Sequence, residues 1–264
     1  MRNRAPANAP GLQTTIDFNV CQRWHKRRDR YRPAGEVFDP RFAGVSEIDT
    51  ATAKAYVIDH HYSASFPASR LAVGIFLREP FKPEVLCGVA VMSVPMNQAV
   101  IPAYFPGLAP NDGVELGRLV LADHLAAESW FIARVFKILR ARLPTVRGVI
   151  AYCDPLPRTD ARGVQAKPGH IGTIYRATNS HAAGRSRART LLLLPDGTVA
   201  NERSLSKIRN NEVGTNYVQR DLQRRGVDRR EFGESGADWI NRLIDGNFLR
   251  RIAHPGNLYF TWAL

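Results

Sequence analysis

The sequence predicts an α/β chain, with a mixed, mostly antiparallel, twisted sheet flanked by helices. Short apolar runs rich in β-branched residues, at residues 71–77, 85–94, 114–121 and 148–153, have the length and composition of strands. A long amphipathic segment between the third and fourth runs predicts one helical crossover between parallel strands. The order of elements is not the regular alternation of a Rossmann fold, and the chain has no GxGxxG or GxxxxGK[ST] motif.

The first elements are expected in the order arm, helix and hairpin. Residues 1–40 are polar, basic and contain proline, so they are expected to form a basic N-terminal arm before a single domain over 41–264. Residues 47–59 (EIDTATAKAYVID) are typical of a helix. The runs 71–77 (LAVGIFL) and 85–94 (VLCGVAVMSV) flank a proline-marked turn at 80–83, which predicts an antiparallel hairpin.

The third strand, 114–121 (VELGRLVL), precedes the long helix. Asp123 is the expected N-cap, and Pro144 follows the expected helix end. One buried stripe follows the helical spacing and consists of Ile132, Val135, Phe136, Leu139 and Leu143. A buried strand, 148–153 (GVIAYC), then ends at Asp154-Pro155.

The C-terminal part is more polar. The basic loop 156–168 is long enough to indicate a functional role rather than a simple connection. Residues 172–179 are typical of a short helix, and residues 189–194 and 197–200 of a hairpin around Pro195-Asp196-Gly197. A helical insertion over about 204–247 and a last strand at 258–264 complete the domain.

Composition excludes several classes of protein. Of 264 residues, 44 % are hydrophobic, which excludes a disordered chain. No apolar run is long enough to span a membrane, and no apolar signal core follows the N-terminus. Three widely spaced cysteines form neither a disulfide framework nor a zinc site, which fits a reducing cytoplasm. We therefore expect a cytoplasmic protein with no membrane partner.

Charge indicates a polyanionic partner. The formal net charge is +13, and the pI is about 10.2. The stretch CQRWHKRRDRYR, with Arg27, Arg28 and Arg30, interleaves basic and aromatic residues, which suits phosphate contact and base stacking but equally a solvated arm. A second basic stretch, 158–189, includes Arg162, Lys167 and Arg176, and a third covers 220–230. These last two contain no zinc-finger spacing and no clear helix-turn-helix.

Several residues have side chains suited to chemistry, and each also has a structural interpretation. Asp154 lies at the carboxyl end of a strand and is a candidate base or metal ligand, or a turn former before proline. His61 and His170 are candidate acids, bases or ligands, or structural histidines. Arg118 either pairs with Glu115 or faces an anionic ligand. Tyr175 is a candidate donor, stacking residue or core residue, and Ser129 lies near the positive end of a helix dipole.

Together these motifs form a more specific pattern. The order HYS, GRL, ESWF, YCDP and GHIGTIYRATN, from about residue 60 to 184, resembles the phage Mom family, with 258–264 as the expected last strand. That family modifies adenine in DNA and is related to GCN5-type N-acetyltransferases. The resemblance implies an acetyltransferase-like fold, double-stranded DNA as partner, and conversion of adenine to an N6-carbamoylmethyl form that protects phage DNA from restriction in the host cytoplasm.

The resemblance also implies roles for individual residues. It implies a catalytic group of His61, Tyr62, Asp154 and Tyr175, and cofactor contacts from Arg118, Leu119, Val120 and Ser129. The family has been linked to acetyl-CoA and to iron, for which His61 and Asp154 are suitable ligands. On this interpretation Tyr62 or Tyr175 lies against a flipped adenine, and Arg27, Arg28, Arg30, Arg162, Lys167 and Arg176 contact DNA.

Two features depart from the family pattern. The segment before the long helix (ADHLAA, 122–127) has no glycine, whereas acetyltransferases hold the CoA pyrophosphate in a Gly-rich turn, and Asp123 and Glu128 add negative charge there. The loop 156–168 also separates the Asp-Pro and Gly-His motifs by more residues than expected. Two alternatives remain: a conventional acetyl-CoA-dependent acetyltransferase for a small amine or a protein, and a non-catalytic DNA-binding protein. The oligomeric state is open, with a dimer as one option.

Overall fold

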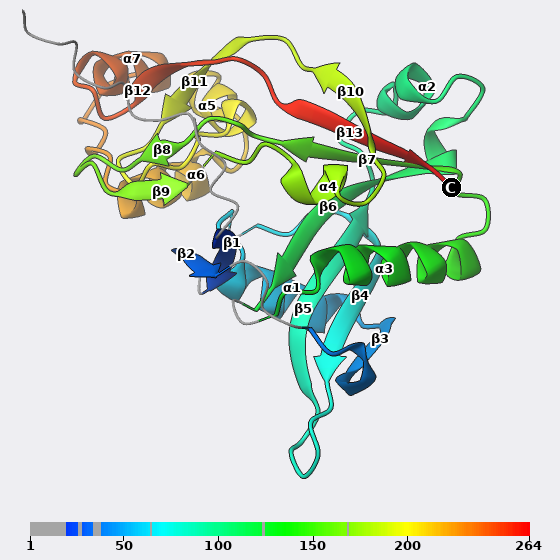
Figure 1. The fold of residues 1–264 in the computed structure, drawn as a ribbon. Coiled ribbons are helices and arrows are strands. Elements are labelled where there is room, and N and C mark those ends of the chain that lie inside the picture. The colour runs from blue at the N-terminus through cyan, green and yellow to red at the C-terminus, as the bar shows by residue number, and fades with distance from the viewer. Residues whose placement is uncertain (1–19, 26–27, 34–37, 64, 123–124, 168) are drawn as a thin grey trace, which may run out of the picture. The chain divides into compact units, whose positions relative to one another are not determined.

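The computed structural model describes residues 20–25, 28–33, 38–63, 65–122, 125–167 and 169–264 (Figure 1). Contacts within the chain divide it into two compact units. The sheet unit comprises the described residues of 15–154, 170–186 and 257–264, and the helical unit those of 155–169 and 187–256. The loop 156–168 and the helices after residue 200 both belong to the helical unit. The single domain expected over 41–264 stays a prediction.

A seven-stranded sheet forms the sheet unit. Its strands, in spatial order, are β10 (His181–Arg185), β13 (Leu258–Ala263), β7 (Gly148–Cys153), β6 (Gly113–Leu121), β5 (Val85–Ser93), β4 (Ser69–Leu77) and β3 (Ala43–Glu47). All neighbours are antiparallel except β6 and β7, which are parallel. The predicted fold class, including the single crossover, is confirmed.

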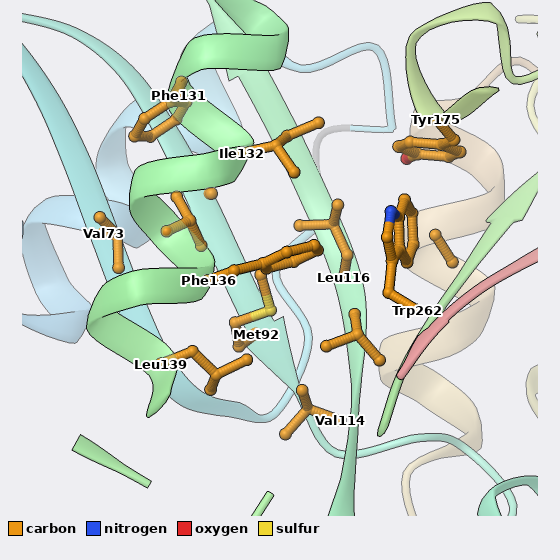
Figure 2. Packing of buried hydrophobic residues seen from close by; sticks show 14 of the residues in the cluster. Val73, Met92, Val114, Leu116, Phe131, Ile132, Phe136, Leu139, Tyr175 and Trp262 are labelled. Carbon is orange, nitrogen blue, oxygen red and sulfur yellow. The ribbon is translucent and has the colours of Figure 1, made fainter. Parts of the chain in front are cut away.

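Helix α3 (Glu128–Arg142) provides the crossover and covers one face of the sheet. Its buried residues Phe131, Ile132 and Phe136 pack over the sheet strands (Figure 2), and the Phe136 ring lies beside that of Trp262 with centroids 5.4 Å apart. The N-cap of α3 is Ala127, with no side-chain hydrogen bond, so the expected cap at Asp123 is wrong. Leu125 and Ala127 are buried in the core, which holds the chain outside the helix until Glu128. Asp123 itself lies outside the described residues.

Helices α1 and α2 pack on the opposite face. In α1 (Thr50–His60), Asp49 caps the first turn by accepting the Thr52 N–H at 2.8 Å. The buried side of α1 contacts a second cluster that includes Val89, Val91 and Val120. Helix α2 (Val100–Tyr104) lies over the beginning of β6, where a Cβ on Gly113 would meet Ile101 at 2.3 Å.

The remaining elements of the sheet unit are short. Strands β1 (Val20–His25) and β2 (Arg28–Pro33) form an antiparallel pair inside the segment expected to be an arm. Helix α4 (Thr173–Arg176) is shorter than the predicted 172–179. Two 3-10 turns, η1 (Pro40–Phe42) and η2 (Pro110–Asp112), complete the unit.

The helical unit has three helices and two strand pairs. The helices are α5 (Glu202–Arg209), α6 (Thr215–Arg224) and α7 (Gly236–Asp245), within the predicted insertion except for the first residues of α5. The pairs are β8 (Arg158–Thr159) with β9 (Gln165–Lys167), and β11 (Arg189–Leu193) with β12 (Arg250–His254). The turn at Asp196 is present, since Leu194 N–H donates to Thr198, but the main partner of β11 is β12. None of the helices described is both long and apolar enough to cross a bilayer.

Candidate active site

The parallel strands β6 and β7 part after three paired positions. Their pairing ends at Glu115 and Ile150, after which β6 continues along β5 to Leu121 and β7 continues along β13 to Cys153 (Figure 1). Beyond this point, the facing edges of the two strands lack a strand partner in the described chain. Backbone groups at such edges, near the carboxyl ends of parallel strands, are available to a ligand.

A β-bulge at Gly117 shapes β6 at this position. Arg118 pairs with Val91 and Leu116 with Met92, so Gly117 is the extra residue. Because Val91 and Ser93 share a face of β5, their partners Arg118 and Glu115 share a face of β6. A Cβ at position 117 would lie 2.4 Å from the Ser93 hydroxyl oxygen, so this approach of the two strands favours glycine.

Glu115 is a further functional candidate, which the sequence indicates only as a possible partner for Arg118. Burial raises its pKa from 4.5 to about 7, and the nearby Arg118 charge offsets part of this effect. A carboxyl group with a pKa near 7 suits general acid–base chemistry at neutral pH. The signal in the sequence is a carboxylate inside a strand whose other residues, apart from Arg118 and two glycines, are apolar.

Arg118 is held by the loop that follows α1. Its Nε donates to the Ser65 carbonyl at 2.9 Å and its Nη2 to the Ser65 hydroxyl at 2.7 Å. Burial lowers the pKa of Arg118, while Tyr62, Glu115 and Tyr175 act on it in the opposite direction. Two roles were predicted for Arg118, as a partner of Glu115 or as a contact for an anionic ligand. Arg118 interacts with Glu115 electrostatically, while its side chain donates hydrogen bonds to Ser65.

The same loop connects Arg118 to His61. The Ser65 hydroxyl lies 3.3 Å from that of Ser63, which lies 2.9 Å from His61 Nδ1. Ser63 N–H also donates to Nδ1, so the neutral His61 ring carries its proton on Nε2. The ring of Tyr62 packs on that of His61 with centroids 4.3 Å apart.

Tyr175 approaches the site from α4. It is buried, and its ring packs on Phe260 and Trp262, with centroids 5.5 Å away in each case, and on His170 at 5.6 Å. Burial is the main reason that the pKa of Tyr175 lies well above its usual value, with Cys153, Tyr62 and Glu115 adding to the shift. The hydroxyl therefore stays protonated and is a hydrogen-bond donor at neutral pH.

The chain between β7 and α4 positions Tyr175. Asp154 ends β7 as predicted, and its carbonyl accepts the His170 N–H at 2.8 Å. Gly172 has φ of 78°, and a Cβ there would lie 2.3 Å from the Phe260 ring. Glycine at position 172 thus permits the turn into α4.

A group of tyrosines lies on the same sheet face as Glu115, by the register of β6, β7 and β13. The Tyr259 ring lies 5.0 Å from that of Tyr152 and 5.1 Å from that of Tyr104. Burial raises the pKa of Tyr104 to about 12, and burial with the Glu115 charge also raises that of Tyr152. These rings offer a stacking surface that the sequence analysis did not identify.

The predicted cofactor residues are dispersed. Leu119 packs against the core beneath α3, and Val120 is buried beneath α1, so their side chains are structural. Ser129 is exposed in the first turn of α3 and lines a pocket of about 340 Å³. The other lining residues are Ile132, Ala133, Phe136, Arg140, Ala177, Thr178 and Asn179.

The predicted iron ligands are His61 and Asp154. No three His, Cys, Asp or Glu side chains in the described part of the chain come together in a way that could hold a metal ion. Asp123 and His124 lie outside it. Ligation by His61 and Asp154 stays a prediction from the sequence.

The predicted DNA-binding residues have different environments. Arg27 lies outside the described residues, and Arg28 and Arg30 belong to β2, of which only the backbone is described. Arg162 is exposed beside Asp160, and Arg176 is exposed with its guanidinium 5.5 Å from the Phe260 ring centroid. Lys167 is only 4 % exposed, so the expectation that it contacts a phosphate at the surface does not agree with its burial.

Comparisons with known proteins place the chain in a family. The model of the Mom protein family matches residues 43–234. No curated protein matches the sequence. The structure is similar to one described as a "Tandem GNAT protein from the clavulanic acid biosynthesis pathway (without AcCoA)", with TM-score 0.40 and 9 % identity, covering 84 % of this chain and 98 % of that one.

Proposed function

The chain belongs to the Mom protein family, and on that premise we propose that it is a phage-type transferase that modifies adenine in DNA. The proposed product is N6-carbamoylmethyl adenine, and the proposed role is protection of DNA from restriction. The family match over 43–234 carries the proposal, because it includes His61, Arg118, Asp154 and Tyr175.

The proposed site is the point where β6 and β7 part. An adenine in duplex DNA has to leave the base stack before a protein can reach its N6. The Tyr62 ring beside His61, and the rings of Tyr152 and Tyr259, are aromatic surfaces suited to stacking on such a base. The electrostatic interactions of Tyr62 with Arg118 and of Tyr152 with Glu115 support this placement.

Glu115 is the proposed base. Attachment of a carbon to N6 requires loss of a proton from that nitrogen. With a pKa of about 7, Glu115 is partly ionised at neutral pH and is basic enough to accept the proton. Tyr175, protonated and buried, and Arg118, oriented by Ser65, are proposed to stabilise negative charge that develops on the donor.

The cofactor proposal concerns the pocket beside α3. Ser129 and Arg140 both line it, about three turns apart on α3, and a hydroxyl and a guanidinium in one pocket suit a phosphate-bearing donor of the acetyl-CoA type. Such a donor would supply only the two carbons of the group. The amide nitrogen of the carbamoylmethyl product, and the two-electron oxidation that joins a methyl carbon to N6, require a further co-reactant, and we propose no route for these steps. The segment before α3 lacks a Gly-rich turn, so contacts of this donor differ from those of ordinary acetyltransferases. We assign no step to iron.

The experiment that tests the function is nucleoside mass spectrometry of plasmid DNA from cells that produce the protein. The proposal expects deoxyadenosine with the added mass of a carbamoylmethyl group, and a plasmid that resists restriction. Unmodified deoxyadenosine contradicts it. If Asp154→Ala leaves the DNA fully modified, the assignment of Asp154 to the site is wrong.

A further inference from the structure

Helices α5 and α6 of the helical unit are joined by a short turn. The cap residues are Asn210 after α5 and Gly214 before α6, so three residues lie between the caps. Gly214, with φ of 89°, and Asn211, with φ of 51°, adopt the left-handed conformation that reverses the chain tightly. Two packed helices joined by a short Gly-containing turn have the kind of connection found in a helix-turn-helix.

Side chains fix α6 against α5. The buried Thr215 hydroxyl hydrogen bonds to the Lys207 carbonyl at 2.9 Å, which ties the beginning of α6 to the last turn of α5. Arg203 forms two hydrogen bonds, of 2.9 and 2.6 Å, with the Glu212 carboxylate in the turn. The apolar contact between the helices comes from one shared core cluster, with Leu205, Ile208, Val218 and Leu222.

Helix α7 packs against α5 and shares its core cluster. A Cβ on Gly236 would lie 2.0 Å from the Ile208 carbonyl oxygen, so the beginning of α7 packs directly against the backbone of α5. Trp239 is fully buried in the same cluster, and its ring N–H donates to the Asp228 carbonyl at 3.2 Å. These contacts fix α5 and the segment after α6 to α7, and α6 joins the same core cluster through Val218 and Leu222.

The other side of α6 is exposed and polar. Thr215, Val218 and Leu222 are buried, so helical spacing places the exposed residues Asn216, Tyr217, Arg220 and Arg224 on the opposite side. Tyr217 is 65 % exposed despite its aromatic ring. Asparagine and arginine are the residues that pair in bidentate fashion with adenine and guanine in the major groove.

Arg220 is positioned for such a contact. It makes no ion pair within the part of the chain that the structure describes, and its Nε bonds only weakly to the Asn216 carbonyl of its own helix, at 3.3 Å. Arg224, by contrast, is paired with Asp221 at 3.2 Å. Asn216 and Arg220 lie in the first two turns of α6, the part of a recognition helix that contacts base edges.

The surrounding charge favours DNA as the occupant. Lys207 and Arg209 lie in the last turn of α5, and Arg229 is exposed beyond α6. The acidic residues of the pair, Glu202, Glu212 and Asp221, are each engaged with an arginine, and the partner of Glu202 is Arg209. A cationic surface around an exposed polar helix matches the phosphates that flank a major groove.

We propose that α5 and α6 form a helix-turn-helix that places α6 in the major groove of duplex DNA, where Asn216 and Arg220 select the sequence to be modified. This inference rests on the proposed function in one respect, since that function makes DNA the substrate. The active site would act on the base, while the helical unit determines which duplexes are bound.

The test is selection of duplexes from a random-sequence library by the full chain. The wild-type protein enriches a recurring motif. Arg220→Ala lowers affinity for that motif roughly 10- to 100-fold and loses the preference at one position. Asn216→Ala has the same effect at a different position. Arg251→Ala, which removes an equal charge from an exposed position on β12, lowers binding less than about threefold and equally for all duplexes.

Two results overturn the inference. One is a selection by the wild-type protein that enriches no motif. The other is Arg220→Ala behaving like Arg251→Ala while circular dichroism shows both folded, which would indicate non-specific charge attraction.

Sequencing of modified adenines separates this inference from the proposed function. If the wild-type protein selects a motif but leaves the DNA unmodified, sequence recognition by α6 is supported and the proposed function is contradicted. If Arg220→Ala modifies the same adenines as the wild type, the proposed function is supported and sequence recognition by α6 is contradicted.

Discussion

Glu115 and Arg118 project from the same face of β6, on either side of the bulged Gly117. In a regular strand, residues three apart point to opposite faces. The extra residue, Gly117, places Glu115 and Arg118 on the same face of β6. Both lie next to the point where β6 and β7 separate. An ionisable carboxyl and a fixed cation are thereby brought together where β6 and β7 separate inside the sheet.

The first prediction concerns the pH dependence of modification. If Glu115 accepts a proton, the rate rises as pH increases through about 7, where the carboxyl ionises. Glu115→Gln removes this dependence and lowers the rate on the order of 10²- to 10⁴-fold. Single-turnover modification across pH measures it. If Glu115→Gln has the same pH–rate profile and the same rate as the wild type, Glu115 is not the base.

The second prediction concerns stability. The folded protein holds the Glu115 proton more tightly than the unfolded chain, because its pKa is raised from 4.5 to about 7. Ionisation therefore costs folding free energy, a cost that grows from about pH 4.5 and is complete above about pH 7. Glu115→Gln should be no more stable than wild type near pH 5 but more stable near pH 8, by at most about 3 kcal/mol. Denaturant unfolding at both pH values measures the difference. If Glu115→Gln changes the free energy of unfolding equally at pH 5 and pH 8, Glu115 is not a buried ionisable group with a raised pKa.

The third prediction concerns the Tyr175 hydroxyl. Tyr175→Phe keeps the ring that packs on Phe260 and Trp262 but removes the buried donor. Modification should fall at least about tenfold, while the melting temperature changes little. Tyr56→Phe, a tyrosine on α1 whose burial also raises its pKa, is the matched control and should leave modification unchanged. Equal activities of the two variants would remove Tyr175 from the chemistry.

The fourth prediction concerns Gly172. Alanine there combines a strained φ of 78° with a Cβ 2.3 Å from the Phe260 ring, so Gly172→Ala should cost about 2–4 kcal/mol of stability. Gly107→Ala is the control: it has φ of 89° but meets nothing within 4 Å. It should cost about 1 kcal/mol from strain alone. Equal losses in denaturant unfolding would show that the ring contact is unimportant.

The sequence predicts the central elements because their signals are local. The stripe of Ile132, Val135, Phe136 and Leu139 identifies α3, and β-branched runs identify β4 to β7. Strands β3 (AGVSE) and β10 (HAAGR) lie at the sheet edges and have little apolar patterning, so they were not predicted. Their pairing depends on partners distant in the sequence.

The site was predicted less completely, for a related reason. His61, Tyr62 and Tyr175 were identified through motifs, and each interacts with Arg118 or with its hydrogen-bonded neighbours. Glu115 was not placed in the site, because its role depends on the bulge at Gly117 and on the divergence of two strands. The α5–α6 pair was not recognised either, since its turn is defined by backbone conformations at Asn211 and Gly214.

The most direct test of the central claim is nucleoside mass spectrometry of plasmid DNA from cells producing either the wild-type protein or Glu115→Gln at equal levels. The account predicts a modified deoxyadenosine with the wild type and its loss, or reduction to traces, with Glu115→Gln. Deoxyadenosine unmodified by the wild type would contradict the function, and equal modification by both proteins would contradict the site at the divergence of β6 and β7.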